Sequence, residues 1–334
     1  MKKLVILDGH AIIHRAFHAI QPLNTSSGEL VNAVFGFTSM LLNVLEIEKP
    51  EYIAIAFDRK GKTFRHHADA TYKATRTKTA PELIGQIGRI YEIARAFSIP
   101  IFAENGFEAD DILGGICERV KAATDLKTII VSGDRDLLQL VNEHVSVHDL
   151  SGGYRKSVNF TPEKVVEKYG FAAKFIPDFK GLAGDSSDNL KGVEGIGEKT
   201  ATSLIQEFGS LEAIYENLEK IKPTLRAKLE KDRTAALHSK MMATIRLDAQ
   251  IEWQLEDCRL NDFDREKVSN LFDGLEFHSL AKRLSKVLPI KTEVTTKIEQ
   301  PSLFGKNALV FEDVFSECSK FLAQRRFLIP RVLE

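Results

Sequence analysis

The chain has 334 residues, of which 43% are apolar and 28% are charged, and its formal net charge is −1. A chain of this length can bury a full core and is expected to form one large domain or two smaller ones. No apolar stretch is long enough to span a bilayer, and the run before Asp8 is too short for a secretion signal. Cys117, Cys258 and Cys318 are too widely spaced to predict a zinc site or a disulfide framework. These features predict a cytoplasmic protein that does not interact with membranes.

Short apolar runs alternate with helical patterns along the first half of the chain. Strands are predicted near residues 3–7, 52–57, 99–103, 127–132 and 145–148. Helices with one apolar side are predicted from Val31 to Glu48 and from Pro81 onward. This alternation predicts an α/β fold with a mostly parallel twisted sheet flanked by helices, whose ligands bind beyond the carboxyl ends of the strands.

Three of the apolar runs lead to an aspartate. Asp8, Asp58 and Asp134 follow the first, second and fourth predicted strands, so their side chains are expected to meet at one edge of the sheet. Asp136 keeps the same side as Asp134 if the chain stays extended. Two further acidic clusters could join this site, namely Glu108 with Asp110 and Asp111, and Asp185 with Asp188.

Any single one of these residues could be a helix cap or a surface acid. So many carboxylates cannot share a small volume without cations, however. Oxygen ligands without histidine or cysteine favour Mg²⁺ or Mn²⁺, and their number favours two ions about 4 Å apart. Such a pair predicts hydrolysis of a phosphodiester by in-line displacement.

A phosphatase provides an alternative interpretation, because Asp134 and Asp136 match the DxD pattern of an aspartyl nucleophile. That chemistry requires the DxD directly after the first strand. Here the first strand leads to Asp8-Gly9-His10, so we disfavour this alternative.

Basic residues are concentrated between Arg59 and Lys78, where seven lysines and arginines stand against one acid, Asp69. A run of this kind is often a solvated surface or a flexible loop. Its position directly after Asp58, between a predicted strand and a predicted helix, favours phosphate binding above the strand ends.

From about Thr161 the strand signals stop and short helices dominate. The segment Gly192-Val193-Glu194-Gly195-Ile196-Gly197 is similar to a helix-hairpin-helix turn, although such a string alone can be a plain turn. Its glycines allow positive φ and close approach, and the free N–H groups of the next helix can meet a phosphate. Lys199 would add charge. The segment before it is not strand-like, which argues against a dinucleotide-binding loop. DNA contacts are therefore predicted for Gly192, Gly195, Gly197 and Lys199.

Taken together, the motifs resemble the 5'-nucleases of the flap endonuclease superfamily, and specifically the 5'-3' exonuclease domain of bacterial DNA polymerase I. The matching segments follow the family order, and they are Leu7-Asp8-Gly9, Ala56-Phe57-Asp58, Tyr72-Lys73-Ala74 with Arg76, Gly106-Phe107-Glu108-Ala109-Asp110-Asp111, Ser132-Gly133-Asp134-Arg135-Asp136, Gly184-Asp185-Ser186-Ser187-Asp188-Asn189 and Gly192 to Ala201.

The resemblance implies a PIN-like catalytic domain over residues 1–160 with a helical arch near residues 59–82. It also implies an all-helical clamp of the helix-hairpin-helix type over residues 161–290 that holds duplex DNA. Residues 291–305 are expected to form a linker, and residues 306–334 are unassigned.

The resemblance also assigns roles to the acidic and basic residues. One Mg²⁺ or Mn²⁺ would be held by Asp8, Asp58, Glu108 and Asp110, and the other by Asp134, Asp136, Asp185 and Asp188. Asp111 would lie close by as a catalytic residue. Lys73 and Arg76 would be arch cations that steer the scissile phosphate and stabilise its developing charge. A monovalent cation such as K⁺ is implied at the helix-hairpin-helix turn.

The implied function is a structure-specific 5'-3' exonuclease and 5'-flap endonuclease of DNA replication and repair. Its substrates would be DNA with a 5' flap or 5' end and RNA–DNA primer junctions, and it would act near the nucleoid as a monomer, either alone or with a DNA polymerase. Two features depart from the family pattern. Thr77-Lys78-Thr79-Ala80-Pro81 stands where a proline-rich stretch is common, and residues 306–334 are too few for a polymerase.

Two alternative functions stay open. A non-catalytic duplex DNA-binding module would keep the clamp, but it should have lost carboxylates, and here every family position is filled. A PIN-type ribonuclease would explain the acidic site but not the clamp.

Overall fold

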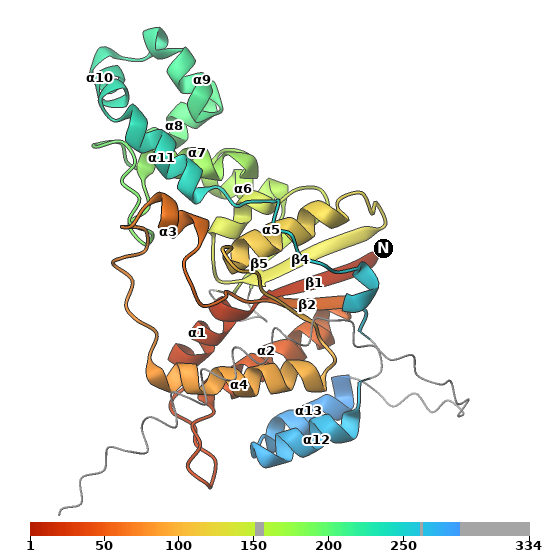
Figure 1. The fold of residues 1–334 in the computed structure, drawn as a ribbon. Coiled ribbons are helices and arrows are strands. Elements are labelled where there is room, and N and C mark those ends of the chain that lie inside the picture. Colours follow the sequence, from red (N-terminus) through yellow and green to blue (C-terminus); the bar gives the residue numbers. More distant parts are fainter. Residues whose placement is uncertain (151–156, 261–262, 288–334) are drawn as a thin grey trace, which may run out of the picture.

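The computed structural model describes residues 1–150, 157–260 and 263–287. The predicted linker, the unassigned segment 306–334 and Cys318 lie outside the described residues. At the centre is a six-stranded sheet in the order β3-β2-β1-β4-β5-β6 (Figure 1). Its strands are β1 (Lys2–Asp8), β2 (Tyr52–Ala56), β3 (Ile101–Phe102), β4 (Leu126–Ser132), β5 (Val145–Asp149) and β6 (Val158–Phe160).

The five predicted strands are all present and are parallel to their neighbours. β3 is shorter than predicted, because it is an edge strand that begins directly after Pro100, which has no N–H to donate. β6, which was not predicted, pairs antiparallel with β5. The fold class predicted from the sequence is confirmed.

Both faces of the sheet are covered, which explains the continuous apolar runs within β1, β2 and β4. In β1, Leu4 and Ile6 belong to the core on one face, whereas Val5 and Leu7 belong to the core on the other. The alternation of side chains along a strand thus divides each apolar run between two cores.

The second of these cores lies under α1 (Gly9–Ala19), α2 (Asn32–Glu48) and α4 (Pro81–Ala96). The last two described helices, α12 (Arg265–Gly274) and α13 (His278–Val287), pack on the same side against α4 and α2 (Figure 1). Phe272 lies 6.2 Å from Phe97, and Phe277 lies 5.3 Å from Phe35, measured between ring centroids. Two helices within the range predicted for the clamp, residues 161–290, therefore pack on the first half of the chain.

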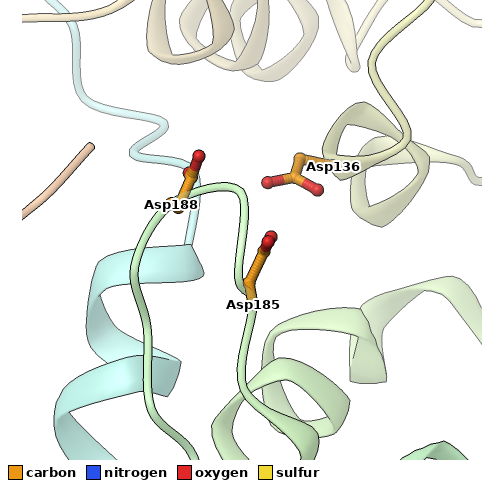
Figure 2. A group of neighbouring side chains, drawn as sticks. All are labelled: Asp136, Asp185 and Asp188. Atoms are coloured by element: carbon orange, nitrogen blue, oxygen red, sulfur yellow. The ribbon is translucent and has the colours of Figure 1, made fainter. Parts of the chain in front are cut away.

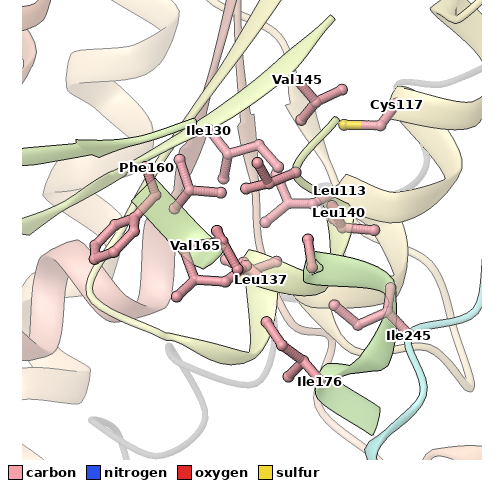
Figure 3. Packing of buried hydrophobic residues seen from close by; sticks show 14 of the residues in the cluster. Leu113, Cys117, Ile130, Leu137, Leu140, Val145, Phe160, Val165, Ile176 and Ile245 are labelled. Carbon is pink, nitrogen blue, oxygen red and sulfur yellow. The ribbon is translucent and has the colours of Figure 1, made fainter. Parts of the chain in front are cut away.

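The other face of the sheet carries α5 (Ala109–Val120) and the 3-10 helix η1 (Asp136–Leu140). Figure 3 shows Leu113 and Cys117 of α5 in one buried cluster with Ile130 of β4 and with residues of the second half of the chain, among them Ile176 and Ile245. The core of the sheet and the core of the helical half are therefore continuous.

Short helices build the second half of the chain, as predicted, and those between residues 198 and 243 extend away from the sheet (Figure 1). They are α6 (Pro162–Tyr169), η4 (Ala173–Phe175), α7 (Ile176–Ala183), α8 (Glu198–Phe208), α9 (Leu211–Glu216), η5 (Leu218–Lys220), α10 (Pro223–Lys231), α11 (Arg233–Ala243) and η6 (Leu255–Cys258). No helix in the described part of the chain has both the length and the apolar surface that crossing a bilayer requires.

The segment between β2 and α4 differs from the expected helical arch. Within it the helix α3 (Phe64–Ala68) is short, and turns follow it. The Asp69 carboxylate accepts a hydrogen bond from the N–H of Thr71 at 2.7 Å, a local bond that competes with helix formation. Lys73 has a left-handed backbone with φ of 55°. These turns place the side chains of Tyr72, Lys73 and Arg76 next to the carboxylates described below.

Candidate active site at the carboxyl ends of the strands

The order of the strands reverses between β1 and β4. From β1 the chain builds outward through β2 and β3, and it then returns to β4 on the opposite side of β1. Open α/β sheets bind ligands at such a point, beyond the carboxyl ends of the strands. Asp8 is the last residue of β1, and Asp134 follows the end of β4, so both residues stand at this crevice.

Asp8 is held in place by donors from α1 and from β4. Its Oδ1 accepts from the N–H of Ala11 at 3.0 Å, and its Oδ2 accepts from the hydroxyl of Ser132 at 2.6 Å. The Ser132 oxygen in turn accepts from the N–H of Asp134 at 2.9 Å. Burial, together with the charges of Asp134 and Asp58, raises the pKa of Asp8 to about 7. Ser132 was not predicted as a site residue. The sequence feature that could have indicated it is a hydroxyl side chain directly before Gly133-Asp134.

The amino end of α5 brings in the next group of carboxylates. Asp58 Oδ1 accepts from the N–H of Ala109, the first residue of α5, at 2.6 Å. Glu108 is the N-cap of this helix and Asp110 lies in its first turn. Burial raises the pKa of Asp110 well above its ordinary value, and Asp134 and Asp8 raise it further.

Asp136 reaches the site by a different route from the one expected. The chain does not stay extended after Asp134 but turns into η1, and the N–H of Asp136 donates to Asp134 Oδ1 at 2.8 Å. Burial and the charge of Asp134 raise the pKa of Asp136 to about 6, even though Lys180 is adjacent.

Asp185 and Asp188 stand on the loop between α7 and α8, facing Asp136 (Figure 2). Backbone hydrogen bonds of 2.8 and 2.7 Å between Asp185 and Leu190 close this loop. Each of the three aspartates offers an oxygen, and these oxygens lie within 4.8 Å of one another. The three carboxylates are therefore close enough to share one cation.

Lys180 of α7, which the sequence patterns did not single out, lies between two of these aspartates. Its ammonium donates to Asp136 Oδ1 and to Asp185 Oδ2. For Asp185, burial alone would raise the pKa, but Lys180 and Ser187 outweigh it and lower the pKa to about 2. No signal in the sequence marks Lys180, because its partners belong to other elements.

The basic segment supplies further cations to the site. Lys73 Nζ donates to Glu108 Oε2 at 3.0 Å, and Arg76 Nη2 donates to Asp188 Oδ1 at 2.6 Å. The hydroxyl of Tyr72 lies 3.1 Å from both of these carboxylates. Both predicted arch cations thus lie at the carboxylates, and Tyr72 links the two acidic groups. Tyr72 was not predicted as a site residue.

Asp111 is placed differently from the catalytic role expected for it. It is fully buried, and its two oxygens accept from Nη1 and Nη2 of Arg65 at 2.7 and 2.9 Å. The N–H groups of Glu108 and Arg246 also donate to it, at 3.0 and 2.9 Å. These partners occupy its oxygens, so Asp111 supports the amino end of α5. Arg65 belongs to the basic segment that was predicted to bind phosphate, but it is buried as the partner of Asp111.

The turn between α7 and α8 has the geometry predicted for it. Gly192 and Gly195 have φ of 63° and 74°, values that favour glycine. A Cβ on Gly192 would lie 2.3 Å from the backbone nitrogen of Gly184. Gly197 is the N-cap of α8, and Lys199 lies exposed in the first turn of that helix.

Comparison with known proteins identifies the family. Residues 3–170 match the model of the 5'-3' exonuclease N-terminal resolvase-like domain, and residues 171–266 match that of the 5'-3' exonuclease C-terminal SAM fold. The chain belongs to the 5'-3' exonuclease family. It is a 5'-3' exonuclease, and therefore an enzyme that hydrolyses phosphodiester bonds. The resemblance stated from the sequence motifs is confirmed.

Curated relatives of this exonuclease include two DNA polymerases I. That of Caldicellulosiruptor bescii is 45% identical over 284 residues, which are 84% of this chain and 33% of the relative. That of Bacillus caldotenax is 39% identical over 334 residues, which are 100% of this chain and 37% of the relative. The exonuclease thus spans about a third of the length of these relatives.

Solved structures share the fold. The T5 5'-exonuclease with bound zinc ions has a TM-score of 0.62 and 18% identity, covering 86% of this chain and 98% of that one. Human GEN1 in complex with Holliday junction DNA has a TM-score of 0.58 and 12% identity, covering 97% and 92%.

Proposed function

We propose that this exonuclease is also a 5'-flap endonuclease that depends on two divalent ions. The observation that carries the proposal is the convergence of carboxylates from β1, β4, α5, η1 and the α7–α8 loop at one crevice. Its substrates would be DNA with a 5' flap or 5' end and RNA–DNA primer junctions, in replication and repair.

The residues present fit divalent cations. Asp8 and Asp136 have pKa values raised to about 7 and about 6, so each would bind a proton readily unless a cation took its place. Oxygen ligands of this kind suit Mg²⁺ or Mn²⁺. The proposed ligands are Asp8, Asp58, Glu108 and Asp110 for one ion and Asp134, Asp136, Asp185 and Asp188 for the other. When bound, such ions supply a water of lowered pKa and neutralise charge on the attacking and leaving oxygens.

The basic residues would position the phosphate. Arg76 is half exposed, with 49% of its side chain accessible, and its partner Asp188 belongs to the site. Lys73 lies on the Glu108 side of the same crevice. A scissile phosphate between them would meet a cation on each side, which stabilises the charge that develops during cleavage.

The helical half would hold the duplex. The N–H groups at the start of α8 follow a glycine cap, and Lys199 lies exposed in the same first turn. This arrangement suits a phosphate. In this proposal Gly192, Gly195, Gly197 and Lys199 form the DNA contact, with a monovalent cation such as K⁺ at the turn. Two further points stay predictions. One is that the protein acts as a monomer near the nucleoid, alone or joined to a DNA polymerase. The other is the pair of domain limits at residues 160 and 290.

Flap cleavage tests this function directly. Incubation of the chain with a 5'-flap duplex and Mg²⁺ should release the flap, and EDTA should prevent release. Asp134→Asn should abolish cleavage and leave duplex binding. Asp125→Asn is a matched control, because Asp125 precedes β4 at the opposite end of that strand and its side chain is 69% exposed.

Each alternative function has its own outcome. Bound but intact flap DNA in the wild-type reaction would favour a non-catalytic binding module. Cleavage of RNA strands without any cleavage of DNA would favour a PIN-type ribonuclease.

A further inference from the structure

The two acidic groups of the site differ in what neutralises them. In the group of Asp136, Asp185 and Asp188, the ammonium of Lys180 contacts the first two and the guanidinium of Arg76 contacts the third. In the other group, Lys73 and Arg65 both contact Glu108. Asp8 of that group accepts its hydrogen bonds from uncharged donors, a backbone N–H and the hydroxyl of Ser132, so no single cation among the described residues bridges two of its carboxylates as Lys180 does.

Lys180 is fixed in this position by its helix. It belongs to α7, whose Ala183 leads into the loop that carries Asp185, and its side chain is only 13% exposed. Lys180 therefore contacts two of the three carboxylates, those of Asp136 and Asp185, that could share a divalent ion at this group. An ammonium and a divalent ion repel each other strongly at contact distance in a partly buried site.

We propose that Lys180 is a positioning residue that acts as a tethered cation at the second metal site and keeps the affinity of that site for its ion low. The inference rests on the two-ion function proposed above and deepens it. Without an ion, Lys180 neutralises Asp136 and Asp185 and holds the α7–α8 loop in place. An ion bound at this group would require the ammonium to move away from these two carboxylates, so the two sites would fill in order, with the Asp8 side first.

Counting bound Mn²⁺ tests this order without any measurement of activity. Titration of the nucleic-acid-free 334-residue chain, followed by electron paramagnetic resonance of free Mn²⁺, should show one tighter and one weaker site. Lys180→Met should tighten the weaker site by about 10-fold to 100-fold, the range in which neighbours of metal ligands usually act. Lys180→Arg keeps the charge and should keep the weak affinity.

Lys240→Met is the matched control. Lys240 also bridges two carboxylates, Asp178 and Glu212, at 2.6 Å each, but outside the site. This variant should leave both Mn²⁺ affinities unchanged. If Lys180→Met does not fold even with Mn²⁺ present, Lys180→Gln, which keeps a hydrogen-bond donor but no charge, takes its place in the same titration.

Two failures can be told apart. If the wild-type chain binds no Mn²⁺ and cleaves no flap, the proposed function is wrong. If the wild-type chain binds two ions and cleaves, but neither uncharged variant tightens the weaker site, only the role of Lys180 is refuted.

Discussion

Replacing Arg65 with methionine should destabilise the fold more than any exposed charge change. Its side chain is 3% exposed and that of Asp111 is 0% exposed. Besides this pair, Arg65 donates from Nε to the carbonyl of Met242 at 2.8 Å and from Nη2 to that of Thr244 at 3.0 Å. The guanidinium therefore joins α3, α5 and the end of α11.

The size of the effect follows from the burial of the pair. Removing one partner of a buried ion pair leaves an unpaired charge and costs about 3–5 kcal/mol. Since each kcal/mol shifts the Tm of a domain of this size by about 2–4 °C, the expected loss is on the order of 6–20 °C. The double variant Arg65→Met/Asp111→Leu removes both charges and should recover at least half of this loss.

Thermal and urea unfolding, followed by circular dichroism, measure the difference. Arg89→Met is the control, because Arg89 also pairs with two carboxylates, Glu29 and Glu92, but its side chain is 38% exposed. That surface network should contribute only about 1 kcal/mol or less. If Arg65→Met unfolds no earlier than Arg89→Met, the buried network does not hold these three elements together.

Three further predictions concern pH, cleavage and the clamp. Burial raises the pKa of Asp8 from 3.8 to about 7, so between these pH values the folded chain in EDTA binds more protons than the unfolded chain. The Tm of the folded chain should therefore fall as pH rises from 4 to 7. Saturating Mg²⁺ should remove this fall. Lys73→Ala should slow flap cleavage by orders of magnitude with little loss of affinity for the DNA. Separate measurements of kcat and Kd would show this difference. A loss of affinity alone would mean that Lys73 only binds the DNA and does not act in cleavage. Gly192→Ala should lower both stability and duplex affinity, because the new Cβ would lie 2.3 Å from the nitrogen of Gly184. Gly85→Ala in α4 is the control, since its Cβ would meet nothing within 4 Å. This control should stabilise the folded chain by up to about 1 kcal/mol. Equal behaviour of the two glycine variants in urea unfolding and DNA binding would contradict this reading of the turn.

The positions of most acidic residues could be predicted because they depend on the backbone of the sheet. An apolar run that ends in aspartate fixes both the strand and the edge at which its carboxylate emerges. Asp8 and Asp134 therefore lie where the sequence indicates, on neighbouring strands. The helix over residues 32–48 and the glycine turn before α8 were predictable for the same reason, since their signals are local.

The partners of these residues could not be predicted, because they come from distant parts of the chain. Arg65 belongs to a basic stretch whose charge suggests exposure, yet all four of its acceptor residues lie on segments far away in sequence. Lys180 shows the same difficulty, since an isolated lysine on a helix gives no sign of a buried position. The turn at Asp69 replaced the expected arch helix because a side chain satisfied a backbone N–H that a helix would have used.

The continuous core beneath α5 has a consequence for where the enzyme cuts. Leu113, Ile130, Ile176 and Ile245 belong to one buried cluster that spans the sheet and the helical half. A swinging motion of one half against the other would expose this apolar surface to water, which is costly. The two halves should therefore move as one rigid body. If the helical half binds the duplex as proposed above, their packing fixes the distance from that contact to the reacting phosphate and so sets the position of the cut.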